Sequence, residues 1–522
     1  MLTHHHYQRA PVLLPAFVVL IGLLLRLALL GVDVRFHPDE ALFAAQARLV
    51  SHEGDWLLRT TDLDKPPLTF YTTALSFRLL GPTEFAARLP NVLFSAVSIA
   101  VLIALARSLY GDPLLAVLAG LLLALSPYDL AFAATVFTDV QATGWTLIAA
   151  LCAVRDRWQL AGIAAALIFA TKPNALLFLP LIIALGIAHN ATSNWRWRDV
   201  VWRLWRMAWP FALGIGIVVL WDVGRAPRSF LELGAQRNKP GRWIRADEVG
   251  PRLEQWGHWL GFITGSRLVN GFAVVGGGIG LVSRLRQRTR ATVTDWLIVG
   301  AGMGWLAGHW LIAFNTYDRY VHTLVPFAVL LIARVIKAAS PPGPLSIPNG
   351  EGEIARDFQV PLSNSVGEGD LGGEANHGID LTLTHIGQKI RHLLPLMIIA
   401  LILPHTITAL YGDLPLGGDQ DQHTGIDDLA AYLNTNLSGA IVYDHGLGWE
   451  LAYYLGRDPQ IHLLYHALPE ALADDMRAQT ATRYFVAPSP EAAAPWLDAL
   501  RRVEITITPV YHAEFVIYAL KP

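Results

Sequence analysis

Carboxylates and a histidine follow the first long apolar run of the chain directly, in the sequence His37-Pro38-Asp39-Glu40. Proline is favourable in a first helical turn, so the spacing predicts a helix over 40–50 with Asp39 at its start. Apolar residues on one side of this segment indicate that the helix lies in the membrane interface. Asp39 could serve only as a helix cap, but a second adjacent carboxylate favours a role in proton transfer.

A second group of charges combines cations with carboxylates. In Asp64-Lys65-Pro66-Pro67 the paired prolines fix an extended backbone and hold Lys65 in a rigid, non-helical position. Glu84 and Arg88 follow at the start of the next apolar run. These residues fit either a structural ion-pair network or a site in which cations bind an anion while a carboxylate moves a proton.

Three further polar positions stand at the ends of apolar runs. Asp139 would lie near the edge of the hydrocarbon layer, where a charge is costly and calls for a function or a capping role. Lys172 precedes a proline, as Lys65 does. In Tyr317-Asp318-Arg319-Tyr320, Arg319 is placed to meet a lipid phosphate, and the two tyrosines fit either that site or an interfacial anchor.

The elements that position these residues are membrane helices. Of the 522 residues 53% are hydrophobic and only 16% are charged, whereas soluble proteins have about 25% charged residues. The 40 basic and 42 acidic residues exclude a nucleic-acid-binding chain, and the single cysteine, Cys152, excludes an internal disulfide. The composition therefore predicts a polytopic α-helical membrane protein.

A bilayer core needs about 20 apolar residues per helix. We expect about eleven crossings, and the first is a retained anchor because it is too long for a signal peptide. The expected spans are 11–30, 88–107, 113–127, 138–154, 159–171, 174–188, 208–221, 257–283, 292–314, 320–337 and 392–411. Basic residues such as Arg107, Arg155 and Arg157 then share one side, which places the N-terminus in the cytosol of a plasma-membrane protein.

The chain divides into four parts. Residues 1–337 form the transmembrane module, with a first outside loop over 31–87. Residues 338–391 are rich in glycine, proline and acids and are expected to be a disordered cytosolic linker. A last transmembrane helix over 392–411 leads to a small extracytoplasmic α/β domain over 417–522, where short β-rich runs alternate with helical patterns.

Other common chemistries lack their motifs. The chain has no glycine-rich phosphate loop, no cysteine and histidine metal cluster and no nucleophile elbow. Soluble nucleotide chemistry is therefore not expected.

The order of the Asp-Glu pair, the Lys-Pro-Pro, the Arg-x-Pro, the aspartate at the fourth span and the late Arg-Tyr resembles the GT-C membrane glycosyltransferases. More narrowly, residues 10–335 are similar to the branch of protein O-mannosyltransferases and the lipid A aminoarabinose transferase. The resemblance implies Asp39 as general base with Glu40 beside it, and Lys65, Arg88 and Arg319 as ligands of a donor phosphate. It implies substrate-binding positions at Asp64, where the lipid A transferase has glutamate, and at Asp139, Lys172, Tyr317 and Tyr320.

The implied reaction moves a sugar from a polyprenyl-phosphate donor to an acceptor outside the cytosol. A single carboxylate without a covalent intermediate predicts inversion at the anomeric carbon. Lysine and arginine would neutralise the phosphate, so no cofactor is obligatory, and His37 beside Asp39 leaves a divalent metal open. Protein, lipid and glycan acceptors all fit, as do hexose, pentose and amino-sugar donors, and membrane lipid is a further partner.

Two other classes of function compete. A transporter or flippase for a lipid-linked sugar would also need cations that face a lipid phosphate, although its polar residues would concentrate near the membrane midplane. A non-catalytic assembly factor would use its outside domain to bind a partner, and the presence of Asp39 and Lys65 argues against it.

Overall fold

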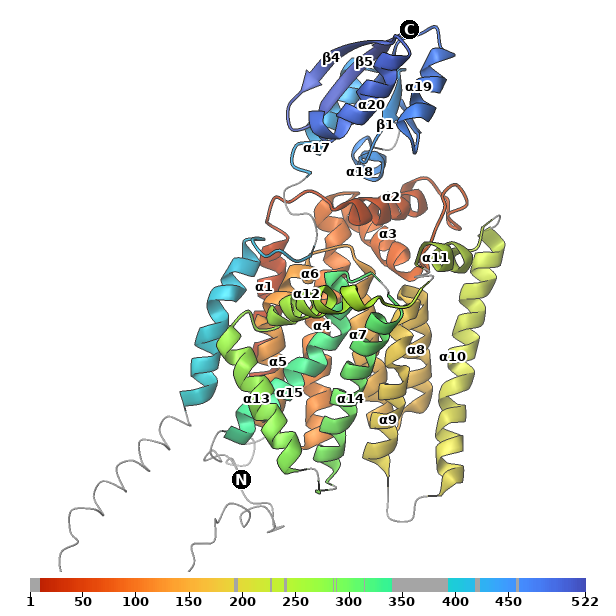
Figure 1. Cartoon of the computed structure of the whole chain (residues 1–522). Helices are drawn as coiled ribbons and strands as arrows, with labels where there is room; N and C mark the ends of the chain where they lie inside the picture. The colour runs from red at the N-terminus through yellow and green to blue at the C-terminus, as the bar shows by residue number, and fades with distance from the viewer. Residues whose placement is uncertain are drawn as a thin grey trace, which may run out of the picture.

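The computed structural model describes most of the chain (Figure 1). It covers residues 10–191, 196–225, 228–238, 242–284, 286–287, 289–313, 315–339, 393–417, 423–456 and 460–522. The predicted linker over 338–391 lies outside the described residues except for 338–339.

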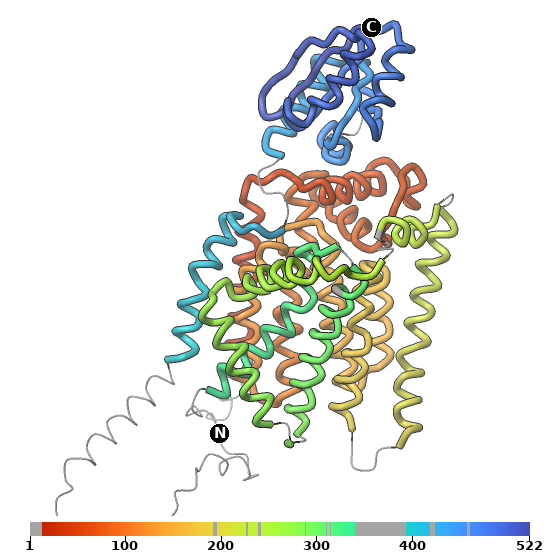
Figure 2. The backbone as a smooth tube through the Cα atoms, viewed as in Figure 1, coloured from red at the N-terminus to blue at the C-terminus, as the bar shows by residue number. Residues whose placement is uncertain are grey.

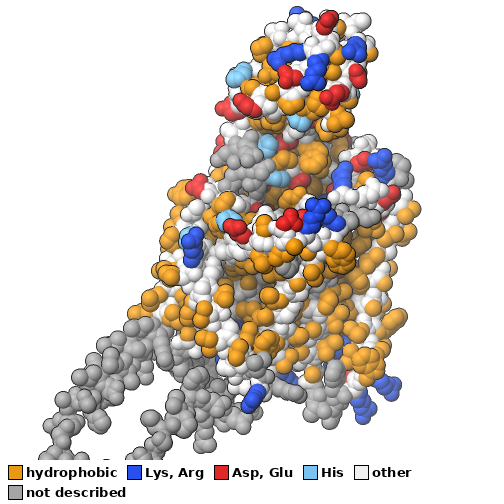
Figure 3. All heavy atoms as spheres, viewed as in Figure 1, with side chains coloured by type: hydrophobic (Ala, Val, Ile, Leu, Met, Phe, Trp, Pro, Cys, Tyr) orange, Lys and Arg blue, Asp and Glu red, His pale blue; other side chains and the backbone are white. Residues whose placement is uncertain are grey.

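Long apolar helices form the body of the protein. Among the described residues, five helices are long and apolar enough to cross a membrane: Glu84–Tyr110, Pro173–Asn190, Trp197–Arg225, Asp318–Ala339 and Leu393–Leu410. The pair Pro113–Leu125 and Pro127–Ala133, bent by 57°, makes a sixth if it is counted as one span, and there are shorter apolar helices besides. Figure 3 shows apolar side chains covering the visible face of this bundle. The predicted polytopic helical membrane protein is confirmed, while the number of eleven crossings stays a prediction.

The helices of the membrane module run in the order in which Figure 1 labels them. They are α1 (Ala10–Leu29), α2 (Pro38–His52), α3 (Leu68–Leu80), α4 (Glu84–Tyr110), α5 (Pro113–Leu125), α6 (Pro127–Ala133), α7 (Thr138–Val154), α8 (Trp158–Thr171), η1 (Pro173–Phe178), α9 (Leu179–Asn190), α10 (Trp197–Arg225), α11 (Phe230–Asn238), η2 (Ala246–Glu248), α12 (Val249–Gly261), α13 (Arg267–Ser283), α14 (Arg290–Leu311), η3 (Asp318–Leu324) and α15 (Val325–Ala339).

The predicted span over 257–283 is wrong, because this segment forms two helices. Helix α12 ends at Gly261, and α13 begins at Arg267 after Ser266 caps it by accepting a hydrogen bond from the backbone N–H of Val269. Gly265 between them has a φ of +71°, which favours glycine and interrupts a helix. In Figure 1 α12 lies across the bundle rather than along it.

Helix α2, which the sequence pattern placed in the membrane interface, has extensive protein contacts. Ala41, Phe43, Ala44, Ala47 and Val50 are buried within the protein. The helix lies across one end of the bundle and packs against α3 and against α18 of the C-terminal domain (Figure 1). Leu42 and Leu49 of the predicted apolar side are only partly buried, and the interfacial position stays a prediction.

Small residues let α8 and α10 pack closely. A Cβ atom at Gly162 of α8 would lie only 2.2 Å from the carbonyl oxygen of Met207 in α10, and one at Gly214 would lie 2.3 Å from the Cβ of Ala166. Glycines at such crossings allow backbones to approach within a membrane, where little hydrophobic force joins helices.

The C-terminal domain is a five-stranded sheet with helices, and Figure 2 shows it beyond one end of the bundle. The strand order is β2-β1-β3-β5-β4, with β1 parallel to β2 and β3, and β5 antiparallel to β3 and β4. Two apolar cores flank the sheet. The elements are α17 (Ile426–Asn436), β1 (Ile441–Asp444), α18 (Gly448–Tyr454), β2 (His462–Tyr465), α19 (Pro469–Arg477), β3 (Arg483–Ala487), α20 (Pro490–Arg502), β4 (Thr506–His512) and β5 (Val516–Lys521).

Candidate active site

Asp39 does not cap helix α2, which was the alternative to a role in proton transfer. The cap of α2 is His37, whose Nδ1 accepts a hydrogen bond from the Asp39 backbone N–H at 3.1 Å, while the Glu40 carboxylate accepts one from the His37 N–H. The Asp39 carboxylate instead lies 2.7 Å from the guanidinium of Arg319. Both side chains are about one-fifth exposed, so the pair is reachable from outside.

Arg319 reaches Asp39 from η3, which precedes α15. Its guanidinium lies over two aromatic rings, 4.9 Å from the centre of Phe137 and 5.0 Å from that of Tyr317. Such stacking holds a planar guanidinium in place while its outer N–H groups stay available for an oxyanion.

Lys172 forms the second ion pair of the site, with Asp139. The backbone of Lys172 is extended, with φ of −156° and ψ of 99°, as expected before Pro173, and this conformation separates α8 from η1. The Lys172 ammonium also lies 4.8 Å from the centre of the Tyr320 ring. Asp139 is in the first turn of α7, where no side chain caps the helix, so its carboxylate is used for the ion pair and not for a cap.

Lys65 forms the third pair, with its neighbour Asp64 at 3.0 Å. Arg237 of α11 also approaches Asp64, at 3.3 Å. Burial alone would raise the pKa of Asp64, but Lys65 and Arg237 outweigh it and hold that pKa below its ordinary value. The carboxylate is therefore charged at neutral pH, and Lys65 is about one-quarter exposed.

The three pairs belong to one electrostatic site. Arg319 interacts with Asp139 as well as with Asp39, and Lys172 interacts with both Arg319 and Lys65. The structure thus brings together residues from the first loop, α7, the α8–η1 junction and η3. Each cation faces a carboxylate, so an incoming phosphate would compete with these acids for the N–H donors of the cations.

Arg88 does not join this group, in contrast to the phosphate-binding role that the sequence predicted for it. Its side chain is buried, and its terminal nitrogens donate to the carbonyl oxygens of Val34 at 2.9 Å and Arg35 at 3.3 Å. Its Nε lies 3.5 Å from Glu40, whose carboxylate also accepts the backbone N–H of Val136 at 2.9 Å. Arg88 and Glu40 therefore tie the first loop to the bundle beside Asp39.

Sequence reasoning missed a buried polar cluster behind the site. Arg26 of α1 and Asp129 of α6 form a fully buried ion pair at 2.5 Å, and Ser95 donates to Asp129 at 2.6 Å. His322 lies 3.3 Å from the same carboxylate. Residues three apart lie on the same side of a 3₁₀-helix. The spacing of Arg319 and His322 within η3 was therefore the signal that His322 lies close to the site.

A metal site is not evident in the part of the chain that the structure describes. No group of three or more His, Cys, Asp or Glu side chains there is arranged to hold an ion. His37, which left a metal open, uses Nδ1 to cap α2.

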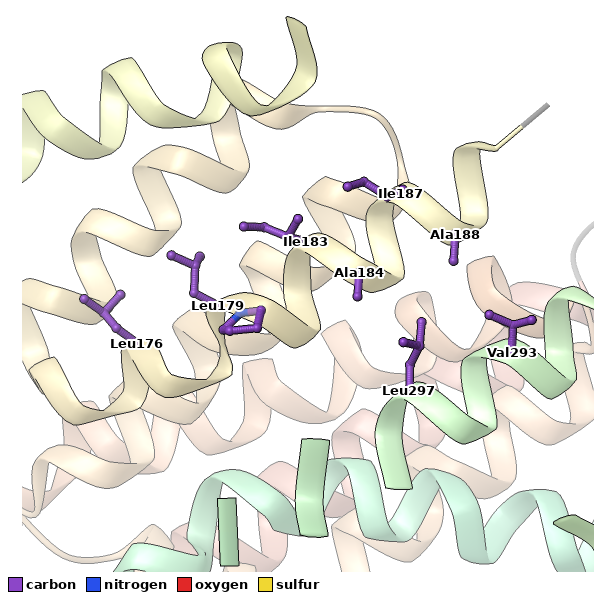
Figure 4. A pocket seen from close by; sticks show the side chains of 9 residues that line it. Leu176, Leu179, Ile183, Ala184, Ile187, Ala188, Val293 and Leu297 are labelled. Atoms are coloured by element: carbon purple, nitrogen blue, oxygen red, sulfur yellow. The ribbon is translucent and has the colours of Figure 1, made fainter. Parts of the chain in front are cut away.

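An open apolar groove lies along the helices that follow Lys172 in the chain. It has a volume of about 780 Å³ and runs along η1 and α9, with α14 on its other side (Figure 4). One wall extends from Leu176 to Ala188. Leu176 belongs to η1, the 3₁₀-helix that begins directly after Lys172. The remaining lining residues are Leu179, Pro180, Ile183, Ala184, Ile187, Val293 and Leu297.

Comparison with known proteins first identifies the fold. The structure matches that of ArnT from Cupriavidus metallidurans bound to undecaprenyl phosphate with a TM-score of 0.61, over 97% of each chain and at 16% identity. It also matches an oligosaccharyltransferase from Archaeoglobus fulgidus, with a TM-score of 0.52 over 97% of this chain and 73% of that one at 10% identity. The chain therefore has the GT-C fold of membrane glycosyltransferases.

Sequence comparison then indicates the branch. The family model described as dolichyl-phosphate-mannose-protein mannosyltransferase matches residues 64–219. Undecaprenyl phosphate-alpha-4-amino-4-deoxy-L-arabinose arabinosyl transferases match at 29% identity in Pseudomonas savastanoi pv. phaseolicola, over 35% of this chain and 36% of the relative, and at 31% in Pectobacterium atrosepticum, over 33% of each. The matched segment spans about a third of these relatives. The predicted resemblance to the branch of protein O-mannosyltransferases and the lipid A aminoarabinose transferase is confirmed.

Proposed function

We propose that this protein is a membrane glycosyltransferase that moves a sugar from a polyprenyl-phosphate donor to an acceptor on the extracytoplasmic face. The observation that carries this proposal is the pairing of Asp39 with Arg319 at 2.7 Å, next to the Lys172 and Lys65 cations. Asp39 thus lies within a group of cations, while an apolar groove runs along the helices that follow Lys172. The fold of ArnT, whose structure contains undecaprenyl phosphate, supports the same reading.

The donor supplies two chemically different parts, and the site offers a surface for each. The phosphate fits Arg319, Lys172 and Lys65, because charge-assisted hydrogen bonds to phosphate are strong and arginine can bind it with two parallel bonds. The polyprenyl chain fits the groove from Leu176 to Ala188, which is lined by apolar side chains. The sugar would then lie outside the groove, between the cations and Asp39.

Binding of the phosphate to Arg319 frees Asp39 from its ion pair, so the carboxylate can take the proton of an acceptor hydroxyl. The acceptor oxygen then forms a bond to the anomeric carbon, and the bond from that carbon to the phosphate oxygen breaks. The electron pair leaves with the polyprenyl phosphate. Because that product gains negative charge, the fixed cations stabilise the transition state more than the ground state.

Stereochemistry and sidedness follow from the same arrangement. A single displacement with Asp39 as base inverts the anomeric configuration. The C-terminal domain and α2 lie at one end of the bundle (Figure 1). Glu84 at the start of α4 meets Tyr454 of that domain, whereas Arg107 is in the last turn of α4 and Arg155 follows the last turn of α7. The positive-inside rule then places the N-terminus in the cytosol and the site outside.

A flippase for the same lipid is the second candidate. The described cations that would face the phosphate gather at one end of the bundle, whereas alternating access places such residues near the midplane. The geometry therefore favours transfer over transport.

The test is an incubation of the purified protein in lipid with a panel of radiolabelled polyprenyl-phosphate sugars and a membrane extract. We expect label from one donor to move to a new product, which identifies the sugar, while protein-free vesicles form none. Label that crosses the bilayer unchanged would contradict the proposal and favour the flippase.

A further inference from the structure

The C-terminal domain touches the chain immediately before Asp39. The hydroxyl of Tyr454, the last residue of α18, accepts a hydrogen bond from the backbone N–H of Phe36 at 2.9 Å and donates one to the Glu84 carboxylate. Burial and the nearby Glu84 raise the pKa of Tyr454, so the hydroxyl keeps its proton. This one side chain therefore joins the first loop to the start of α4.

Neighbouring contacts make the junction rigid. The Phe36 ring is fully buried, with its centre 4.9 Å from that of Tyr453 and 4.9 Å from the Arg88 guanidinium on another side. The Tyr453 hydroxyl donates to the carbonyl oxygen of Pro82 at 2.9 Å. Phe36 is thus held between the C-terminal domain and the bundle.

Arg48 provides a second attachment between α2 and the C-terminal domain, more than two helical turns from Asp39. Its guanidinium donates to the carbonyl oxygens of Ala452 and Tyr453, both at 2.7 Å. These carbonyls are at the C-terminal end of α18, where a cation is favourable. Both ends of α2 are therefore fixed by α18.

The position of Asp39 depends on these contacts. Phe36 precedes His37, which caps α2 through the Asp39 N–H, and Glu40 completes the cap and meets Arg88. A shift of residue 36 would therefore move the start of the helix and the Asp39 carboxylate relative to Arg319. A misplacement of about 1 Å can cost about 100-fold in rate.

We propose that Tyr454 is a positioning residue of the active site, and that the C-terminal domain acts by fixing α2 so that Asp39 meets the acceptor. This inference rests on the proposed transferase function. The domain would affect the reaction through its contact with the backbone of Phe36 and would not need to touch the donor.

The test compares Tyr454→Phe in the full chain with wild type and with Tyr432→Phe. The substitution removes only the hydroxyl, so folding is retained. Tyr432 is a control because its hydroxyl is also hydrogen-bonded to the backbone, donating to the carbonyl oxygen of Val510 within the C-terminal domain itself. Three quantities are measured: kcat for transfer, the Kd for undecaprenyl phosphate, and hydrogen exchange of the peptide containing Phe36.

We expect Tyr454→Phe to lower kcat about 10-fold and to speed exchange at Phe36, with the Kd for undecaprenyl phosphate within about twofold of wild type and Tyr432→Phe unchanged. Wild-type kcat in Tyr454→Phe, or an equal loss of kcat and undecaprenyl phosphate binding, would overturn the inference. If the wild-type protein transfers no sugar, the proposed function fails. If Tyr454→Phe leaves hydrogen exchange at Phe36 unchanged, the contact on which the inference rests is removed, whatever the transfer assay shows.

Discussion

The Asp39 carboxylate lies 2.7 Å from the Arg319 guanidinium. The guanidinium that holds this carboxylate is also the group proposed to bind the donor phosphate. In the proposed mechanism, a phosphate that binds Arg319 releases Asp39 from the ion pair. On that proposal, the pair couples occupation of the donor site to activation of the base.

Replacing Arg319 should weaken donor binding and transfer together. We expect Arg319→Gln to raise the Kd for undecaprenyl phosphate at least about 10-fold, because a charge-assisted hydrogen bond contributes about 1.5–3 kcal/mol. Isothermal titration in detergent measures this. Arg334→Gln is the matched control, since Arg334 also pairs with an aspartate, Asp295 at 3.0 Å, and stacks on a tyrosine. Equal losses in both variants would count against a phosphate site at Arg319.

Lys65 should contribute to donor affinity with little effect on folding. It is partly exposed, and Arg237 remains beside Asp64 when Lys65 is lost. We expect Lys65→Gln to raise the Kd for undecaprenyl phosphate about 3- to 10-fold with the thermal midpoint nearly unchanged. Lys337→Gln removes an equally exposed lysine, paired with Asp112 at 3.6 Å, and should bind like wild type. Unaltered binding by Lys65→Gln would exclude Lys65 from the donor site.

Lys172 should affect both stability and activity, and a double variant separates the two. Lys172→Gln leaves the buried Asp139 charge without its partner, which costs about 3–5 kcal/mol. We expect Lys172→Gln with Asp139→Asn to recover much of the lost thermal stability but not transfer. Recovery of transfer in the double variant would show that this pair is only structural.

The C-terminal domain should become more stable as the pH falls toward 4. Burial raises the pKa of Asp444 from 3.8 to about 6, although its carboxylate accepts the Leu447 N–H at 2.9 Å. The folded domain then binds the proton more tightly than the unfolded chain, so the free energy of unfolding rises by about 2 kcal/mol between pH 7 and pH 4.

This change in the free energy of unfolding can be measured in the full chain from the hydrogen-exchange rates of the β1 amides, corrected for the pH dependence of the intrinsic rates. Asp444→Asn cannot titrate at this position, so the difference between wild type and this variant isolates the contribution of Asp444. The same pH dependence in both proteins would contradict the assignment to Asp444.

The sequence pointed to charged residues that the fold brings together, but not to the way in which they are held. Asp39, Lys65, Asp139, Lys172 and Arg319 stand at ends of apolar runs, and a charge at such a position is informative because burial in lipid is costly. The ion pairs themselves depend on which helix ends meet in space, and periodicity does not contain that information.

A sequence pattern does not show which partner a side chain meets. Arg88 begins an apolar run, and in the folded chain the carbonyl oxygens of Val34 and Arg35 accept its hydrogen bonds. Helix α2 has an apolar side that fits a membrane surface, and in the fold the helix also packs against α18. The same pattern serves lipid and protein contacts, so the fold is needed to find the protein contacts.

The central claim is that Asp39 removes the acceptor proton, and a single-turnover transfer assay with wild type, Asp39→Asn and Asp33→Asn tests it most directly. Asp33 is a matched control because it is an ion-paired carboxylate in the same loop, 2.7 Å from Arg35. We predict that Asp39→Asn binds undecaprenyl phosphate at least as well as wild type but transfers sugar at least about 100-fold more slowly, while Asp33→Asn is unchanged. Transfer by Asp39→Asn at the wild-type rate would contradict the account.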